Sequence, residues 1–341
     1  MKEVLFGKTF DQLKEVVKHL GLPGFTAKQI ADWLYKKEIV TIEEMTNLSL
    51  KARALLENNF DLGISPFKTV QVSNDGTKKY LFPVHDGKFV EAAYIPDKSR
   101  ATLCVSSQVG CRMGCRFCMT GKQGFQGNLT AGEIVNQVRS LPERENLTNI
   151  VYMGMGEPFD NYQNVMQSLE ILTSDWGFAM SPRRITVSTI GVIPAMEKFL
   201  VESECHLAIS LHTPFDEERK NLMPVQNNHP IEHVISAIRK FDFGKQRRVS
   251  FEYIVFKGLN DTSRHVNQLA KLLNGIRCRI NLIRFHPVPG SEWVSPDFPV
   301  LNTFMEALNK KGLRTTLRAS RGQDIDAACG LLSTKEIEKS V

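Results

Sequence analysis

Three cysteines in one short loop are the residues of this sequence whose type and spacing indicate chemistry most directly. Cys111, Cys115 and Cys118 lie in GCRMGCRFCMTG, in a C-x3-C-x2-C pattern. Three thiolates on one loop can hold three irons of a [4Fe-4S] cluster and leave the fourth iron open to a ligand from outside the protein. A structural zinc site requires four ligands in paired spacing, and no second Cys pair or His pair follows in the sequence. The pattern therefore predicts a reactive iron-sulfur cluster, with a zinc site as the weaker alternative.

The other four cysteines differ in their surroundings. Cys205 and Cys278 border apolar strand-like segments, and we expect both to be packing residues. Cys104 precedes the cluster loop, and Cys329 lies in GQDIDAACG, between two glycines in a segment that we expect to be mobile. Seven cysteines among 341 residues are too few for a disulfide scaffold. Their clustering indicates metal or redox chemistry in a reducing compartment.

The composition is that of a soluble globular protein. Hydrophobic residues make up 42% of the chain and charged residues 23%, and the formal net charge is +6. No apolar run approaches the roughly 18 residues that a membrane span needs. We therefore expect a cytoplasmic protein without a membrane segment. The small basic excess permits a polyanionic partner but does not require one.

The pattern of the chain divides it into four regions. Residues 1–60 contain short amphipathic helices and predict a small helical domain. Residues 61–99 contain strand-like runs separated by NDG and HDG, which predict a β-meander linking two regions. Residues 100–330 alternate seven β-rich runs with helical patterns and predict an α/β domain with a parallel sheet. Residues 331–341 form a C-terminal tail.

Polar and sulfur-containing residues follow successive predicted strands of the α/β domain. They are Cys104, Gly154 to Glu157, Ser188 and Thr189, Ser210 to His212, and Arg284 to His286. Groups contributed by many strands gather at the C-terminal face of a (β/α) barrel, whereas a doubly wound sheet concentrates them at one switch point. We therefore expect a partial TIM-type barrel for residues 100–330.

The cysteine pattern on this architecture resembles the radical S-adenosylmethionine enzymes, in which the open iron is chelated by the methionine moiety of the cofactor. Six motifs extend the likeness to the RlmN family of adenine-C2 RNA methyltransferases, in register from about residue 88 to residue 330. They are SRATLCVSSQVGC, MGMGEP, SPRRITVSTIG, LAISLH, INLIRFHPVPG and DIDAACG. The helical N-terminus resembles, less specifically, the accessory RNA-binding domain of that family.

The resemblance implies a binding site for S-adenosylmethionine at the strand ends. Gly156 and Glu157 match the positions that hold the amino group, and a carboxylate can accept hydrogen bonds from an ammonium. The positions that match contacts to the ribose, the carboxylate and the adenosine are Ser188, Ser210, Leu211, His212 and His286. Many relatives have Asn at the last of these. Without the resemblance, residues of these types at strand ends are more often structural groups.

The resemblance also implies a covalent mechanism, because C2 of adenine has no lone pair with which to displace a sulfonium methyl group. Cys329 takes a methyl group from one S-adenosylmethionine, and a second S-adenosylmethionine yields a radical that abstracts hydrogen from the methylated Cys329. The methylene radical adds to C2, and Cys104 or Glu91 accepts the C2 proton. Attack of Cys104 on the Cys329 sulfur then releases the methylated base and leaves a disulfide. The alternative for Glu91 is a solvent-facing position on the β-meander.

The partners implied by the resemblance are 23S rRNA and tRNA, in the latter at the adenine next to the anticodon. A low-potential electron donor such as flavodoxin and a thiol reductant are implied as well, and we expect a monomer. Basic residues that suit phosphate contacts are Lys245 to Arg248, Arg183, Arg184, Arg314, Arg318 and Arg321. Each of these runs is equally consistent with a solvated face.

Three other functions remain open at this point. The closest is the related adenine-C8 rRNA methylase, although GKQGFQGNLT after the cluster loop is nearer to the C2 enzymes. An electron-carrying iron-sulfur protein is less consistent with the two additional cysteines and the strand-end motifs. A zinc-stabilised RNA-binding protein is the third alternative.

Overall fold

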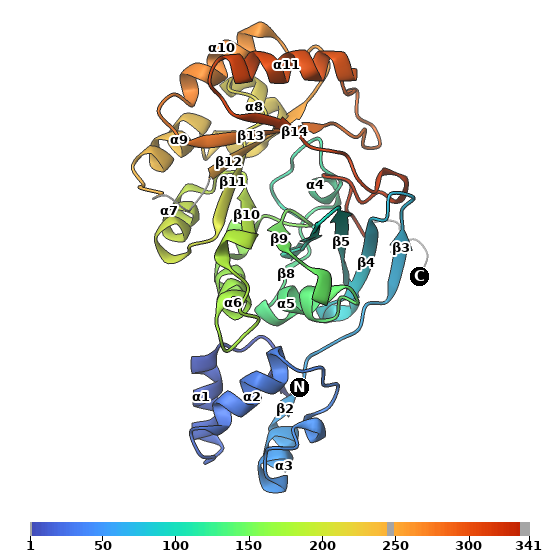
Figure 1. The fold of residues 1–341 in the computed structure, drawn as a ribbon, viewed down its shortest axis with the longest axis vertical. Helices are drawn as coiled ribbons and strands as arrows, with labels where there is room; N and C mark the ends of the chain where they lie inside the picture. The colour runs from blue at the N-terminus through green and yellow to red at the C-terminus, as the bar shows by residue number, and fades with distance from the viewer. Residues whose placement is uncertain (1, 244–248, 335–341) are drawn as a thin grey trace.

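The computed structural model describes residues 2–243 and 249–334, and a ten-stranded sheet forms the body of the molecule (Figure 1). The strands follow the order β14-β13-β12-β11-β10-β9-β6-β5-β4-β3. Seven neighbouring strands are parallel, as the alternating pattern predicts. They are β6 (Arg100–Cys104), β9 (Asn149–Tyr152), β10 (Ile185–Thr189), β11 (His206–Ser210), β12 (Val249–Val255), β13 (Cys278–Arg284) and β14 (Thr315–Leu317).

The predicted meander consists of β3 (Thr69–Val72), β4 (Lys78–Pro83) and β5 (Phe89–Asp97), all antiparallel. Its turns lie at the two predicted positions, and the second contains the short 3-10 helix η2 (His85–Gly87). Strand β5 also pairs with β6 in antiparallel fashion. The meander therefore continues the sheet of the parallel strands, and its side chains share a face with those of the barrel.

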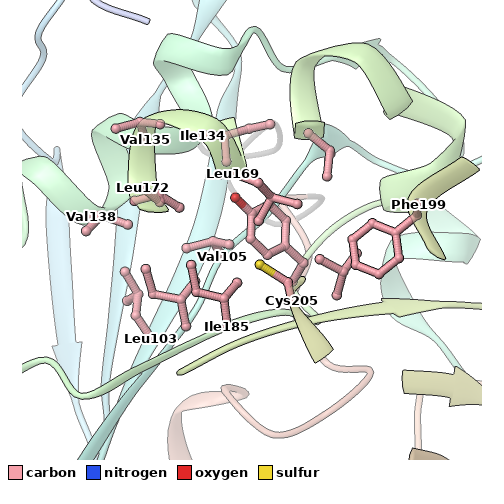
Figure 2. Close-up of a cluster of buried hydrophobic side chains, with 14 of the residues drawn as sticks. Leu103, Val105, Ile134, Val135, Val138, Leu169, Leu172, Ile185, Phe199 and Cys205 are labelled. Carbon is pink, nitrogen blue, oxygen red and sulfur yellow. The ribbon is translucent and has the colours of Figure 1, made fainter. Parts of the chain in front are cut away.

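Helices α5 and α6 cover the outer face of the sheet beside β6, β9 and β10. Figure 2 shows the core between them, in which Leu103 and Ile185 of the sheet face Ile134 of α5 and Leu169 of α6. Cys205 lies in this core with 1% of its surface exposed, as expected of a packing cysteine. The helices of this region are α4 (Met119–Gln123), α5 (Ala131–Arg139), α6 (Tyr162–Thr173), α7 (Ile193–Glu202), α8 (Asp216–Leu222), α9 (Ile231–Arg239), α10 (Ser263–Leu272) and α11 (Phe298–Lys310).

The N-terminal residues form a separate helical layer next to α5 and α6 (Figure 1). It contains β1 (Glu3–Val4), α1 (Phe10–His19), α2 (Thr26–Tyr35), the 3-10 helix η1 (Ile42–Glu44), α3 (Leu50–Asn59) and β2 (Phe60–Asp61). Gln167 of α6 donates to the carbonyl of Gly7 at 2.6 Å, and Arg139 of α5 donates to the carbonyl of Lys37 at 2.9 Å. The layer therefore packs against the helices that stand farthest from β14.

No helix within the described ranges has the length and hydrophobicity that a membrane crossing requires.

Candidate active site

A cavity of about 890 Å³ lies against the inner face of the sheet. Alternate strand residues point into it, such as Thr102 and Cys104 of β6 and Asn281 of β13, while Leu103 and Leu282 between them are buried in the core. Four of the predicted site residues line this cavity, and these are Cys104, Cys118, His286 and Cys329. Side chains that alternate along each strand therefore lie in the core on one face of the sheet and line the cavity on the other.

The cluster loop is closed by a short two-stranded ribbon. Strand β7 (Gln108–Val109) precedes Cys111, β8 (Gly127–Asn128) follows α4, and the two pair in antiparallel fashion. Gly110 has a φ of +70°, and a Cβ there would lie 1.6 Å from the carbonyl oxygen of Gly124. Only glycine permits this close approach. The ribbon thus closes the loop that carries the three thiols, and Cys118 of this loop lines the cavity.

The three thiols of the loop lie within electrostatic reach of one another. Burial raises the pKa of Cys111 to about 12 and that of Cys115 well above its ordinary value, and the charge of Cys118 contributes to both increases. Such thiols ionise when iron binds them. Within the described part of the chain, no three Cys, His, Asp or Glu side chains converge closely enough to hold a single metal ion.

This arrangement fits a cluster better than a zinc ion. Zinc bonds of about 2.3 Å would require sulfur atoms within about 4 Å of one another. In a [4Fe-4S] cluster with three cysteine ligands, each thiolate would bind a different iron, so the three sulfur atoms need not meet at one metal ion. Separated thiols on one loop are therefore the donor set that the cluster needs.

A buried arginine, which the sequence patterns do not single out, supports the cluster loop. Arg219 of α8 is fully buried, and its Nη2 donates to the carbonyls of Ile190 at 2.8 Å and Ser210 at 3.1 Å. Its charge favours the ionised form of Cys115. Arg219 therefore ties the ends of β10 and β11 together and places a positive charge beside the predicted cluster.

Glu157 lies beside the cluster loop with 3% of its surface exposed. Its Oε1 accepts a hydrogen bond from the amide of Phe159 at 3.1 Å, and its Oε2 accepts one from the amide of Ile190 at 3.0 Å. Burial raises the pKa of Glu157 to about 7, and the charge of this carboxylate raises the pKa of Cys111 and Cys115. The carboxylate is thus held rigidly next to the thiols, where it can accept hydrogen bonds from a cofactor ammonium.

The remaining predicted cofactor residues differ in what their side chains reach. Ser188 and Ser210 are partly exposed at the ends of β10 and β11. The side chain of Leu211 is buried in the core, and its amide donates to the carbonyl of Glu252 at 3.0 Å, so its contacts with a ligand are limited to the backbone. His286 faces the cavity, and its Nε2 lies 3.0 Å from the hydroxyl of Ser320.

His212 is buried against the cluster loop. Its Nδ1 accepts a hydrogen bond from the amide of Ile254 at 3.0 Å, and its ring centroid lies 4.8 Å from that of Phe117. Burial, together with the positive charge of Arg219, lowers the pKa of His212 to about 3. The imidazole is therefore neutral, and it supports the segment between Cys115 and Cys118.

Residues 318–334, here called the strap, carry Cys329 across the cavity. At one end, the carboxylate of Asp75 in the β3–β4 turn accepts a hydrogen bond from the amide of Gly322 at 2.9 Å. At the other end, the amide of Met119 donates to the carbonyl of Gly330 at 2.7 Å. The strap is thus attached to the meander before Cys329 and to the cluster loop after it.

Cys104 and Cys329 approach each other where the strap crosses β6. Cys104 is buried against Ala327 of the strap, while Cys329 is exposed to the cavity. Burial, together with the charge of Cys329, raises the pKa of Cys104 to about 12. The walls of the cavity desolvate the Cys329 thiol and keep its pKa above the ordinary value, whereas the positive charge of Arg318 lowers the pKa of both thiols.

Glu91 lies on the same face of the sheet, with 5% of its surface exposed. Its Oε1 is 3.0 Å from Nζ of Lys79, and its Oε2 accepts a hydrogen bond from the amide of Ser333 in the strap at 2.9 Å. The alternative of a solvent-facing glutamate is therefore wrong. A buried carboxylate next to the strap is in a suitable place for proton transfer.

Comparisons with known proteins assign this site to a family. The model of the radical SAM superfamily matches residues 105–273, and the model of the ribosomal RNA large subunit methyltransferase N-terminal domain matches residues 4–62. A relative from Parabacteroides distasonis, named "Probable dual-specificity RNA methyltransferase RlmN", is 57% identical over 98% of this chain and 97% of its own length. The chain belongs to the RlmN family.

Other members of the RlmN family match over nearly their whole length. One from Bacteroides fragilis is 55% identical over 99% of this chain and 98% of its own, and one from Desulfotalea psychrophila is 43% identical over 96% and 94%. The crystal structure of a radical SAM methyltransferase from Sphaerobacter thermophilus covers 97% of this chain with a TM-score of 0.90 and 40% identity. The predicted family and barrel fold are confirmed.

Membership of the radical SAM superfamily implies a [4Fe-4S] cluster and S-adenosylmethionine as cofactors, as the cysteine pattern and the resemblance predict. Members of this family are RNA methyltransferases, and family membership therefore decides against the two weaker alternatives, the electron carrier and the zinc-stabilised binding protein. The roles of the individual site residues and the division into four regions stay predictions. The basic run from Lys245 to Arg248 and residues 335–341 lie outside the described residues.

Proposed function

We propose that this chain methylates C2 of adenine in 23S rRNA and in tRNA, there at the adenine next to the anticodon, through Cys329 and Cys104. The observation that carries the proposal is that both thiols lie on one cavity, one exposed to it and one buried beside it. When bound, the cluster and S-adenosylmethionine supply a methyl group and a radical that can activate it for addition to an unactivated ring carbon.

The residues of the chain then act in sequence. The thiolate of Cys329 takes the methyl group, with two molecules of S-adenosylmethionine consumed in each turnover. After the methyl carbon has joined C2, Glu91 takes the C2 proton. Once the adduct has also given up its unpaired electron to the low-potential redox couple, the thiolate of Cys104 attacks the sulfur of Cys329 and a disulfide forms. The bond between that sulfur and the CH2 group on C2 breaks, its electron pair stays on the carbon, and the carbon takes up a proton to become the methyl group. A thiol reductant returns both cysteines to the reduced state, which suits a cytoplasmic enzyme.

The charge of the cavity supports an RNA substrate. Its lining contains six arginines, namely Arg100, Arg183, Arg184, Arg279, Arg318 and Arg321. Among the described lining residues the acidic one is Asp97, which pairs with Arg321 at 3.3 Å. Arginines neutralise phosphates and stack on bases. We propose a monomer that receives electrons from a low-potential donor such as flavodoxin.

The test is to identify the methylated nucleoside. Anaerobically reconstituted protein is incubated with S-adenosylmethionine, a low-potential reductant, and 23S rRNA or tRNA from a strain that lacks the modification. Mass spectrometry against synthetic standards should find 2-methyladenosine in both RNA pools. Exclusive 8-methyladenosine would favour the related C8 activity, and a colourless protein with stoichiometric zinc and no product would contradict the proposal.

A further inference from the structure

A buried ion pair lies at the junction of the meander and the strap. Nζ of Lys79 is 3.0 Å from Oε1 of Glu91, and the two side chains are 11% and 7% exposed. Burying two charges is costly unless they are paired and hydrogen-bonded. A buried pair at this position therefore indicates that the site requires a charged carboxylate here.

The register of the sheet brings the pair to the reacting cysteines. Lys79 of β4 stands opposite Ala93 of β5, and Glu91 lies two residues before Ala93 on the same face. Ala93 in turn stands opposite Cys104 of β6. Lys79, Glu91 and Cys104 therefore share the inner face of three neighbouring strands.

The second oxygen of the carboxylate holds the strap. Oε2 of Glu91 accepts a hydrogen bond from the amide of Ser333 at 2.9 Å, four residues after Cys329. Both oxygens are thus engaged, one by a cation on the rigid sheet and one by the segment that carries the methyl acceptor. A carboxylate held from two sides keeps a fixed position relative to the base that Cys329 presents to it.

We propose that Lys79 is a positioning residue, which keeps the buried Glu91 ionised and in place beside the strap so that Glu91 can accept the C2 proton. The role rests on the proposed methylation of adenine. Lys79 does not touch the substrate, and it acts through Glu91.

The electrostatics of the pair agree with this role. Burial raises the pKa of Glu91, whereas the charge of Lys79 and the hydrogen bond from Ser333 lower it. Asp326 on the strap faces Glu91 with a like charge and raises its pKa. Without the charge of Lys79 the pKa rises further, so Glu91 stays protonated, and inactive as a base, up to a higher pH.

The experiment compares wild-type holoenzyme with Lys79→Gln and Lys79→Arg. Single-turnover methylation of RNA is measured against pH, starting from protein whose Cys329 is already methylated. In Lys79→Gln the acidic limb of the profile should move upward by about 1 to 3 pH units, the effect of one nearby opposite charge. Lys79→Arg keeps the charge and should restore the wild-type limb.

A neighbouring lysine provides the matched control. Lys78 pairs with Glu143 instead, so Lys78→Gln should leave the limb unchanged. Methylation of Cys329 without RNA, followed by intact-protein mass, reports whether the strap is still in place. In Lys79→Gln, methylation of Cys329 should proceed at the wild-type rate, because this reaction needs no proton acceptor at position 91.

Two outcomes would overturn this role. One is an acidic limb in Lys79→Gln that coincides with the wild-type limb. The other is loss of both Cys329 methylation and RNA methylation without rescue by Lys79→Arg, which would make Lys79 a structural residue. Failure of the wild-type enzyme to methylate adenine would overturn the proposed function and this role with it, and the wild-type lane distinguishes that case.

Discussion

At the end of β9, one glycine is needed for packing and for backbone conformation at the same time. Gly156 has a φ of +101°, and a Cβ there would lie 2.6 Å from Cβ of Gln108. Gln108 also accepts a hydrogen bond from the amide of Glu157 at 2.9 Å, so any displacement of Gln108 moves the carboxylate. The family motif at this position therefore has a structural cause in addition to its proposed contact with the cofactor.

Gly156→Ala should destabilise the protein by about 1 to 3 kcal/mol through backbone strain, with a further loss from the contact with Gln108. Gly258→Ala is the matched control, because Gly258 has a φ of +71° and nothing within 4 Å of a Cβ. Urea unfolding of the two variants separates strain from steric conflict. Equal losses of unfolding free energy would contradict the account of Gly156.

Single residues differ in how well the sequence predicts them. The spacing of Cys111, Cys115 and Cys118 identifies the cluster loop, because the ligands of a cluster on one loop are local in sequence. Arg219 could not be predicted, since its charged neighbours on α8 resemble a solvated face. Its hydrogen-bond partners, Ile190 and Ser210, lie at the ends of two strands that precede it in the chain. The burial of the Leu211 side chain likewise depends on tertiary packing.

Among the elements, the strap carries the reactive Cys329, and a hairpin turn holds its first part. Asp75 accepts hydrogen bonds from the amides of Thr77 at 2.9 Å and Gly322 at 2.9 Å. Burial opposes the charge, but hydrogen bonds from Thr77, Gly322 and Ser73 together lower the pKa of Asp75 to about 2. Because the folded-state pKa lies below the ordinary value, this attachment is complete above about pH 4 and is lost as the pH falls toward the lowered pKa.

Asp75→Asn should therefore loosen the strap, since the amide carries no charge and has one acceptor oxygen fewer. We expect faster amide hydrogen exchange in peptides that cover residues 318–334, measured by mass spectrometry at neutral pH. Asp86→Asn in the other hairpin turn is the control and should leave this exchange unchanged. The same exchange rates in both variants would show that Asp75 does not hold the strap.

The elements themselves follow largely from local patterns. The seven parallel strands agree with the prediction, because periodicity depends on neighbours in sequence. Strands β5 and β6 are close in sequence and pair in antiparallel fashion. The turn residues predict the hairpins of the meander, but they do not show that the meander and the barrel share one sheet. The attachments of the strap join residues about 250 positions apart, such as Asn74 and Asp324, and no local pattern reports them.

For the whole molecule, the decisive property is that the described sheet does not close. Strands β3 and β14 are its two edges, so the cavity is open to a substrate much larger than a cofactor. A base in folded RNA must leave its stack to reach buried chemistry. The open side and the arginine lining give a flipped adenine a route to Cys329, and Cys118 of the cluster loop lines the same cavity.

The most direct test of the covalent account is Cys104→Ala in the reconstituted protein, incubated with RNA, S-adenosylmethionine and reductant. Because Cys104 is proposed to release the product, this variant should accumulate a covalent complex in which tandem mass spectrometry finds C2 of adenine joined through a methylene group to Cys329. Cys329→Ala should form neither complex nor product while it keeps its iron, and Cys278→Ala should behave like the wild type. Full release of methylated RNA by Cys104→Ala, with no covalent complex, would contradict the account.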